Sequence, residues 1–144
     1  KIGKGRIIQE GKKIAILNFG ARLNETLKAS EILEKKGIKP TIIDARFAKP
    51  LDENLIWQLA TTHEAIMTIE EGSIGGFGSH VVDFLSKKGL IDTNLKFRSM
   101  TLPDIFIDQD TPDNMYKIAN LDSKAIEEKI LDVLNSNIIL QKQK

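Results

Sequence analysis

Short apolar runs of strand length alternate along the chain with segments in which apolar residues recur three and four positions apart. Runs rich in Ile, Leu, Val and Ala predict strands, and the three-to-four spacing predicts amphipathic helices between them. The predicted strands cover residues 6–10 (a short edge strand), 13–19, 41–45, 65–69 and 95–102. The predicted helices run from about 23 to 36, from 53 to 62, from 79 to 88, and from about 123 to 135.

Glycines and short polar side chains mark the expected ends of these helices. Gly37 and Gly89 each follow the last apolar position of a helix, as a left-handed C-terminal residue does. Asp52 stands where an N-cap is expected, and Asp122 or Ser123 caps the final helix. The alternation of strands and helices predicts an α/β fold with three layers. It consists of a mainly parallel sheet of about five strands with helices on both faces.

The same pattern divides the chain into three parts. Residues 1–12 are expected to form a lead-in linker with a possible edge strand, residues 13–135 a single α/β domain, and residues 136–144 a disordered tail. Within the domain, the polar and proline-bearing stretch 103–120 predicts a long loop. Residue 1 is Lys and the first methionine is Met67, so we expect a fragment or a processed chain with further sequence upstream.

Composition excludes several classes of function. The 144 residues carry a net charge of +1, with the lysines scattered, which does not indicate a nucleic-acid-binding surface. Without cysteine, disulfides, thiolate nucleophiles and cysteine-bound metals are excluded. No apolar run is long enough to span a bilayer and no signal peptide is evident, so we expect no membrane partner and a cytoplasmic location.

The most informative segment is a glycine-rich turn that follows the predicted strand 65–69. Four of the ten glycines fall between residues 72 and 78, directly after the adjacent carboxylates Glu70 and Glu71. Glycine at this density indicates positive φ or close approach of the backbone to another surface. Because turns after the carboxyl ends of strands often carry function in α/β sheets, the segment is either a ligand cradle or a docking surface.

A phosphate or nucleotide cradle is the less favoured of these two interpretations. The dinucleotide fingerprint G-x-G-x-x-G/A fails at its third glycine, where Val81 stands, and no P-loop pattern is present. Glu70 and Glu71 would also repel a phosphate. A buried carboxylate could perform acid–base chemistry. The favoured interpretation is that one of the two caps backbone N–H groups of its own loop and the other is solvated.

Other polar residues give no self-contained catalytic set. His63 lies near a helix end, where a cation is favourable, and His80 lies in the first turn of the helix after the glycines. Neither has neighbours at the spacing of a metal site. The aspartates of the late loop lack the glycine and glutamate of an EF-hand and are expected to be solvated. The sequence therefore assigns no catalytic, cofactor-binding or metal-binding residue to this chain.

Two segments together carry a resemblance to a known family. Residues 43–52 read IDARFAKPLD and residues 68–79 read TIEEGSIGGFGS, with 14–20 ahead of them and 102–107 behind. In this order they resemble the C-terminal domain of 1-deoxy-D-xylulose-5-phosphate synthases, over residues 2 to 135. A looser K-P-L-D and E-E-G pattern is shared with transketolase-like relatives, including the β subunits of 2-oxo-acid dehydrogenases. The sequence departs from the expected pattern at Ala48, His80, Ile105 and Asp110.

The resemblance implies the third domain of a thiamine-diphosphate enzyme that condenses pyruvate with glyceraldehyde 3-phosphate. Thiamine diphosphate and Mg²⁺ would be held by the upstream catalytic domains of a homodimer, and this domain would brace them and support dimerisation. The candidate docking residues are Arg46, Glu70, Glu71, Gly72, Gly75, Gly76, Phe77 and Gly78. Two alternatives remain open here: the C-terminal domain of a 2-oxo-acid dehydrogenase β subunit, and a stand-alone module that binds an anion or nucleotide at the glycine turn.

Overall fold

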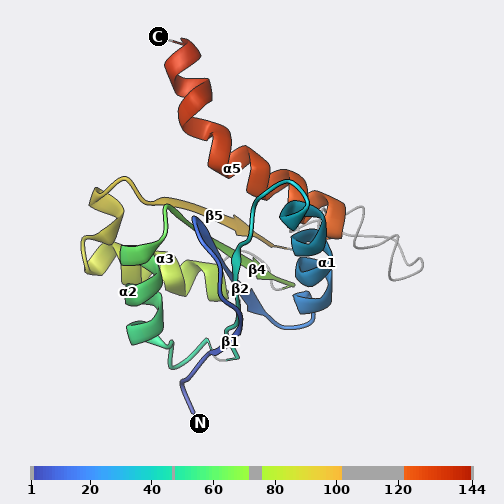
Figure 1. Ribbon diagram of the computed structural model, residues 1–144. Helices are drawn as coiled ribbons and strands as arrows, with labels where there is room; N and C mark the ends of the chain where they lie inside the picture. The colour runs from blue at the N-terminus through green and yellow to red at the C-terminus, as the bar shows by residue number, and fades with distance from the viewer. Residues whose placement is uncertain (1, 47, 72–75, 102–121, 144) are drawn as a thin grey trace, which may run out of the picture.

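A mixed five-stranded sheet forms the centre of the computed structural model, which describes residues 2–46, 48–71, 76–101 and 122–143 (Figure 1). Its strands are β1 (Arg6–Gln9), β2 (Ile14–Phe19), β3 (Thr41–Asp44), β4 (Ala65–Glu70) and β5 (Lys96–Met100). Their order across the sheet is β1-β3-β2-β4-β5, and β1 alone pairs antiparallel to its neighbour among these strands. The predicted mainly parallel α/β sheet is confirmed.

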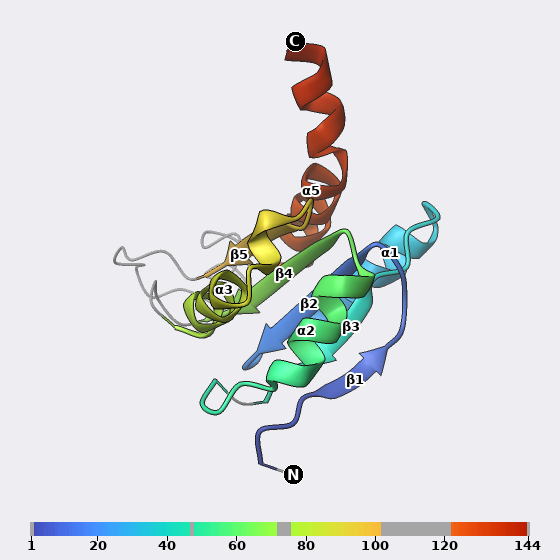
Figure 2. The ribbon, with the colours of Figure 1, turned by 90° about the vertical axis from the view of Figure 1, so that its left-hand side faces the viewer.

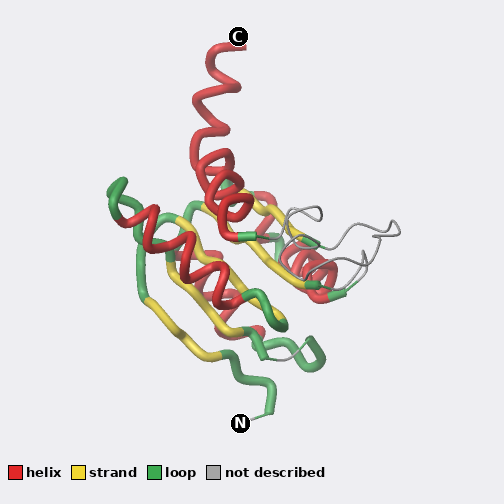
Figure 3. Tube along the Cα trace, turned by 90° about the vertical axis from the view of Figure 1, so that its right-hand side faces the viewer, coloured by secondary structure: helices red, strands yellow, loops and turns green. Residues whose placement is uncertain are grey.

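Helices cover both faces of the sheet, which confirms the predicted three layers. The helices α1 (Leu23–Glu34) and α5 (Ser123–Gln143) pack on one face. The helices α2 (Glu53–Thr62) and α3 (Phe77–Lys87) pack on the other, and the short 3₁₀ helix η1 (Leu90–Asp92) follows α3 (Figures 2 and 3). Because both faces are covered, the central strands are buried and mostly apolar, and the polar side chains Asn18, Thr68 and Glu70 lie toward their carboxyl ends.

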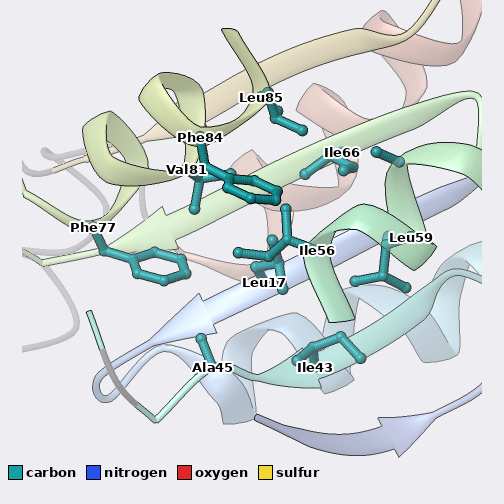
Figure 4. Packing of buried hydrophobic residues seen from close by; sticks show 12 residues of the cluster. Leu17, Ile43, Ala45, Ile56, Leu59, Ile66, Phe77, Val81, Phe84 and Leu85 are labelled. Carbon is teal, nitrogen blue, oxygen red and sulfur yellow. The ribbon is translucent and has the colours of Figure 1, made fainter. Parts of the chain in front are cut away.

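Alternate residues of each central strand supply two separate hydrophobic clusters. Ile16 and Met67 point toward α1 and α5, where they join Leu33 and Ile130. Toward α2 and α3, the second cluster is built from β2, β3 and β4 together with both helices (Figure 4). Its labelled members are Leu17, Ile43, Ala45, Ile56, Leu59, Ile66, Phe77, Val81, Phe84 and Leu85.

The predicted caps stand where expected. An Asp52 carboxylate oxygen accepts a hydrogen bond from the Leu55 backbone N–H at 3.2 Å, and Asp122 does the same for Ala125 at 3.0 Å. Gly37 and Gly89 adopt the left-handed conformation, with φ of +82° and +70°. The predicted bounds of α2 agree with the structure.

Two predicted boundaries differ from the structure. α3 begins at Phe77 and not at residue 79, because the Glu70 carboxylate accepts the N–H groups of its first residues. α5 continues as helical backbone to Gln143, where the sequence analysis expects a disordered tail over 136–144. No glycine or proline interrupts the chain after Ser123, so nothing in the sequence breaks this helix. The predicted loop 103–120 lies outside the described residues.

Candidate functional site

The carboxyl ends of the parallel strands meet at one edge of the sheet, and the candidate residues gather there. From β2 the chain continues to β3 on one side of β2 and then crosses to β4 on the other side. The direction in which strands are added to the sheet therefore reverses between β2 and β4. Such a reversal separates the loops that follow the two strands and is the usual position of a functional site in α/β sheets. In chain order, the segment after β2 leads to α1 and the segment after β4 leads to α3.

Glu70 closes the glycine turn from inside the domain. The residue is 2% exposed, and its carboxylate oxygens accept hydrogen bonds from the backbone N–H groups of Phe77 (2.8 Å) and Gly78 (2.5 Å). A carboxylate at this position satisfies donors that the first turn of a helix leaves free and complements the helix dipole. The prediction that one of the paired carboxylates caps its own loop is confirmed for Glu70.

Glu71 anchors the other side of the turn. Its Oε1 accepts a hydrogen bond from Nε of Arg22 at 3.1 Å, so the prediction of a solvated second carboxylate is wrong. The Arg22 side chain is 10% exposed and that of Glu71 is 35% exposed. Arg22 directly precedes α1, so this ion pair links the segments that follow β2 and β4. The sequence analysis missed Arg22, because nothing in its local pattern indicates a partner across the sheet edge.

Phe77 and Gly78 belong to the buried start of α3. The Phe77 ring stacks on Phe19 from the end of β2, with ring centres 5.1 Å apart and planes 7° from parallel. At Gly78 a β-carbon would lie 2.8 Å from Thr68 Oγ1 and 3.2 Å from Glu70 Oε2. The predicted close backbone approach is therefore confirmed at Gly78, and the surface it approaches is the domain's own strand β4.

The remaining candidates lie at or near the surface. Gly76, the residue before α3, is half-buried. Arg46 is exposed and has a φ of +65°, and it follows β3, with β2 between it and β4. Gly72 and Gly75 lie outside the described residues. The structure thus divides the predicted docking set into a buried group that shapes the turn (Glu70, Phe77 and Gly78) and a surface group (Arg46, Glu71 and Gly76).

Comparison with known proteins identifies the family of this chain. The family model described as "Transketolase, C-terminal domain" matches residues 3–126. The chain belongs to this family. The fold also matches a solved structure described as "Split gene transketolase, inactive beta4 tetramer", at 28% identity and a TM-score of 0.84, over 94% of this chain and 43% of that one.

Two further solved transketolases share the fold at lower identity. The R525L mutant from Pichia stipitis is 16% identical with a TM-score of 0.61, over 91% of this chain and 18% of that chain. The enzyme from Campylobacter jejuni subsp. jejuni is 13% identical with a TM-score of 0.65, over 90% of this chain and 18% of that chain. The transketolase C-terminal domain described here therefore spans less than half the length of the first of these proteins and less than a fifth of the others.

His63 of this transketolase C-terminal domain is a structural residue at the end of α2. Its Nε2 lies 2.7 Å from Thr41 Oγ1, which also accepts the Gly11 N–H at 3.0 Å, and its Nδ1 lies 3.1 Å from the Leu59 carbonyl oxygen. A neutral ring protonated at Nδ1 satisfies all three contacts. Burial lowers the pKa of His63 and outweighs the Leu59 hydrogen bond, which raises it. The expectation that a cation is favourable at this helix end is therefore wrong for His63, because burial favours the neutral ring.

Acidification is expected to destabilise the domain through His63. The pKa is 6.5 in the unfolded chain and lower in the folded one, so the unfolded state takes up the proton first as the pH falls. The free energy of unfolding should then decrease below pH 6.5, by at most about 1.4 kcal/mol per pH unit, and level off below the folded pKa. Urea unfolding from pH 7.5 to 5.0 measures this slope. The dependence of the free energy of unfolding on pH should be weaker in His63→Gln and unchanged in His80→Gln. Equal slopes in the two variants would contradict the attribution of this dependence to His63.

The second histidine, the search for metal ligands and the helix lengths add no catalytic or metal site among the described residues. His80 lies in the first turn of α3, half-buried, and no group of three His, Asp or Glu side chains is placed to hold a metal ion in the described ranges. Among these same residues, no helix has the length and apolar character that crossing a membrane requires. The predicted aspartate loop lies outside them.

Proposed function

We propose that this chain is the C-terminal domain of a 1-deoxy-D-xylulose-5-phosphate synthase. The complete cytoplasmic enzyme would condense pyruvate with glyceraldehyde 3-phosphate, releasing carbon dioxide and forming 1-deoxy-D-xylulose 5-phosphate. One observation carries this proposal: the motifs DARFAKPLD (44–52) and EEGSIGGFGS (70–79) occur in order within a chain of the transketolase C-terminal family. The product would supply isoprenoid, thiamine and pyridoxal synthesis.

The proposed task of this domain is docking and dimerisation. Glu70 fixes the end of the glycine turn on α3, and the Arg22–Glu71 ion pair fixes its beginning on the segment before α1. Because these contacts hold the described residues on either side of the glycines, a partner that binds there would lose little conformational entropy in ordering them. The partners would be the upstream catalytic domains and the second subunit of a homodimer. The description of the split-gene relative as a tetramer supports assembly in this family.

In this proposal, upstream domains would hold thiamine diphosphate and Mg²⁺. The described residues provide no metal-ligating group of three side chains, and the only carboxylate buried at the sheet edge, Glu70, already accepts two backbone N–H groups. When bound, the cofactor would supply the carbanion chemistry that joins the two substrates. This domain would contribute by holding the catalytic domains in position, because small displacements of catalytic groups lower the reaction rate strongly.

A second candidate is a transketolase that transfers a two-carbon ketol group between sugar phosphates. It is favoured by the 28% identity and TM-score of 0.84 with the split-gene transketolase. Assaying the complete protein separates the two candidates. Carbon dioxide release from pyruvate that requires glyceraldehyde 3-phosphate supports the synthase. Ketol transfer from xylulose 5-phosphate to an aldose phosphate, without pyruvate turnover, supports the transketolase.

Docking through the glycine turn is tested by Gly76→Val in the complete protein. Gly76 is half-buried at the start of α3, so a branched side chain there would obstruct a partner surface. We expect a weaker dimer in light scattering and at least about a tenfold loss of activity, while the urea unfolding of the 144-residue chain changes by less than about 1 kcal/mol. Ser86→Val, at an exposed position of the same helix, is the matched control. Unchanged dimer mass and activity in Gly76→Val would rule out this docking surface.

A further inference from the structure

A second surface feature lies at the amino edge of the parallel strands, at the opposite end of the sheet from the glycine turn. The turn between β1 and β2 meets the loop between α1 and β3, and the blue chain that leaves β1 runs up beside α1 in Figure 2. Between them is a hollow of about 480 Å³, here called the lysine hollow. Its lining residues are Glu10, Gly11, Lys12, Lys13, Gly37, Ile38 and Lys39.

Backbone contacts fix the walls of the lysine hollow. The Lys12 N–H donates to the Lys39 carbonyl oxygen at 2.8 Å, and the Gly11 N–H donates to Thr41 Oγ1 at 3.0 Å. A side chain at Gly11 would overlap the carbonyl oxygens of Lys39 and Pro40, so only glycine permits this approach. The two segments are therefore held together before any ligand arrives, which lowers the entropic cost of binding.

The charge of the lysine hollow is strongly one-sided. Three of its lining residues are lysines and Glu10 is its single acidic residue, and all four are exposed. None of these four side chains takes part in the ion pairs found within the described ranges, whereas Lys28, Lys36 and Lys87 each have an acidic partner there.

Lys13 occupies an unusual backbone position within the hollow. Its φ is +71°, a conformation that costs a non-glycine residue roughly 1 kcal/mol. Its carbonyl oxygen accepts the N–H groups of Glu64 and Ala65, at 2.7 and 3.1 Å, which holds the chain in this conformation. Glycine would relieve the strain, so a lysine here points to a use for its side chain at the hollow.

We propose that the lysine hollow binds a small phosphorylated anion, a diphosphate or the phosphate ester of a compact organic molecule. Three lysines among the residues that line one hollow give it a positive charge that suits a phosphate group better than a single carboxylate. The volume falls within the range of small-molecule sites, and Ile38 with the lysine stems offers apolar contact to an organic portion. This site is separate from the docking turn and does not depend on the proposed function.

Calorimetric titration of the 144-residue chain with inorganic diphosphate tests the proposal. Saturable one-to-one binding is expected, with amide chemical-shift changes in NMR spectra confined to residues 10–13 and 37–39. The triple variant Lys12→Gln, Lys13→Gln, Lys39→Gln should bind at least about tenfold more weakly. A matched triple variant, Lys4→Gln, Lys88→Gln, Lys124→Gln, removes the same charge at exposed positions elsewhere and should bind normally.

Three outcomes would overturn the proposal. The first is no saturable binding of diphosphate at 50 mM salt. The second is an equal loss of affinity in both triple variants, which would show general electrostatic attraction and not a site. The third is displacement of bound diphosphate by a lower concentration of a polyglutamate peptide, which would identify an acidic protein segment as the preferred occupant.

Discussion

Replacing Glu70 with alanine is expected to lower the free energy of unfolding by about 4 kcal/mol. The carboxylate is 2% exposed and accepts hydrogen bonds from two backbone N–H groups at the start of α3. Hydrogen bonds to a charged group contribute roughly 1.5–3 kcal/mol each. Without the carboxylate, the N–H groups of the buried residues Phe77 and Gly78 lose their acceptors.

Urea unfolding of the 144-residue chain measures this loss. Glu70→Gln keeps one acceptor oxygen but turns an amide donor toward an N–H group. We therefore expect an intermediate decrease in the free energy of unfolding, about 2 kcal/mol. Glu128→Ala, at an exposed position on α5, is the control and should change stability by less than about 0.5 kcal/mol. A loss in Glu70→Ala similar to that in Glu128→Ala would show that Glu70 does not hold the helix.

The second large decrease in stability is expected for Gly78→Val, which should lower the free energy of unfolding by about 3 kcal/mol. The new β-carbon would lie 2.8 Å from Thr68 Oγ1 and 3.2 Å from Glu70 Oε2. Thr68 is fully buried on β4 and cannot turn into solvent, so α3 must move away from the sheet. That movement would also lengthen the Glu70 hydrogen bonds and part the stacked rings of Phe19 and Phe77.

Ser86→Val controls for the lower helix propensity of a β-branched residue, since Ser86 is exposed near the end of α3. Thermal unfolding followed by circular dichroism should show a clear decrease in melting temperature for Gly78→Val and little change for Ser86→Val. A melting temperature in Gly78→Val equal to that of the control would show that α3 does not need glycine at its contact with β4. In that case the close approach would have no energetic consequence.

Local signals were sufficient for most elements of the fold. The bounds of α2, the caps Asp52 and Asp122, and the left-handed glycines Gly37 and Gly89 each depend on a few adjacent residues. Apolar runs that are buried on both faces predict a parallel sheet between helices, and the structure has that sheet. The start of α3 was predicted too late, because its cap is the side chain of Glu70 on the preceding strand and not a residue beside the helix.

The sequence by itself determined the α/β class and the transketolase C-terminal family, and it predicted a docking role for the turn after β4. Only the tertiary structure decided what the described residues on either side of that turn do. It buries Glu70 beneath α3, pairs Glu71 with Arg22, and presses Gly78 against Thr68. The physical reason is that helix and strand periodicity are properties of neighbouring residues. An ion pair such as Arg22–Glu71, or the lysine hollow between residues 10–13 and 37–39, exists only when the sheet brings distant segments together.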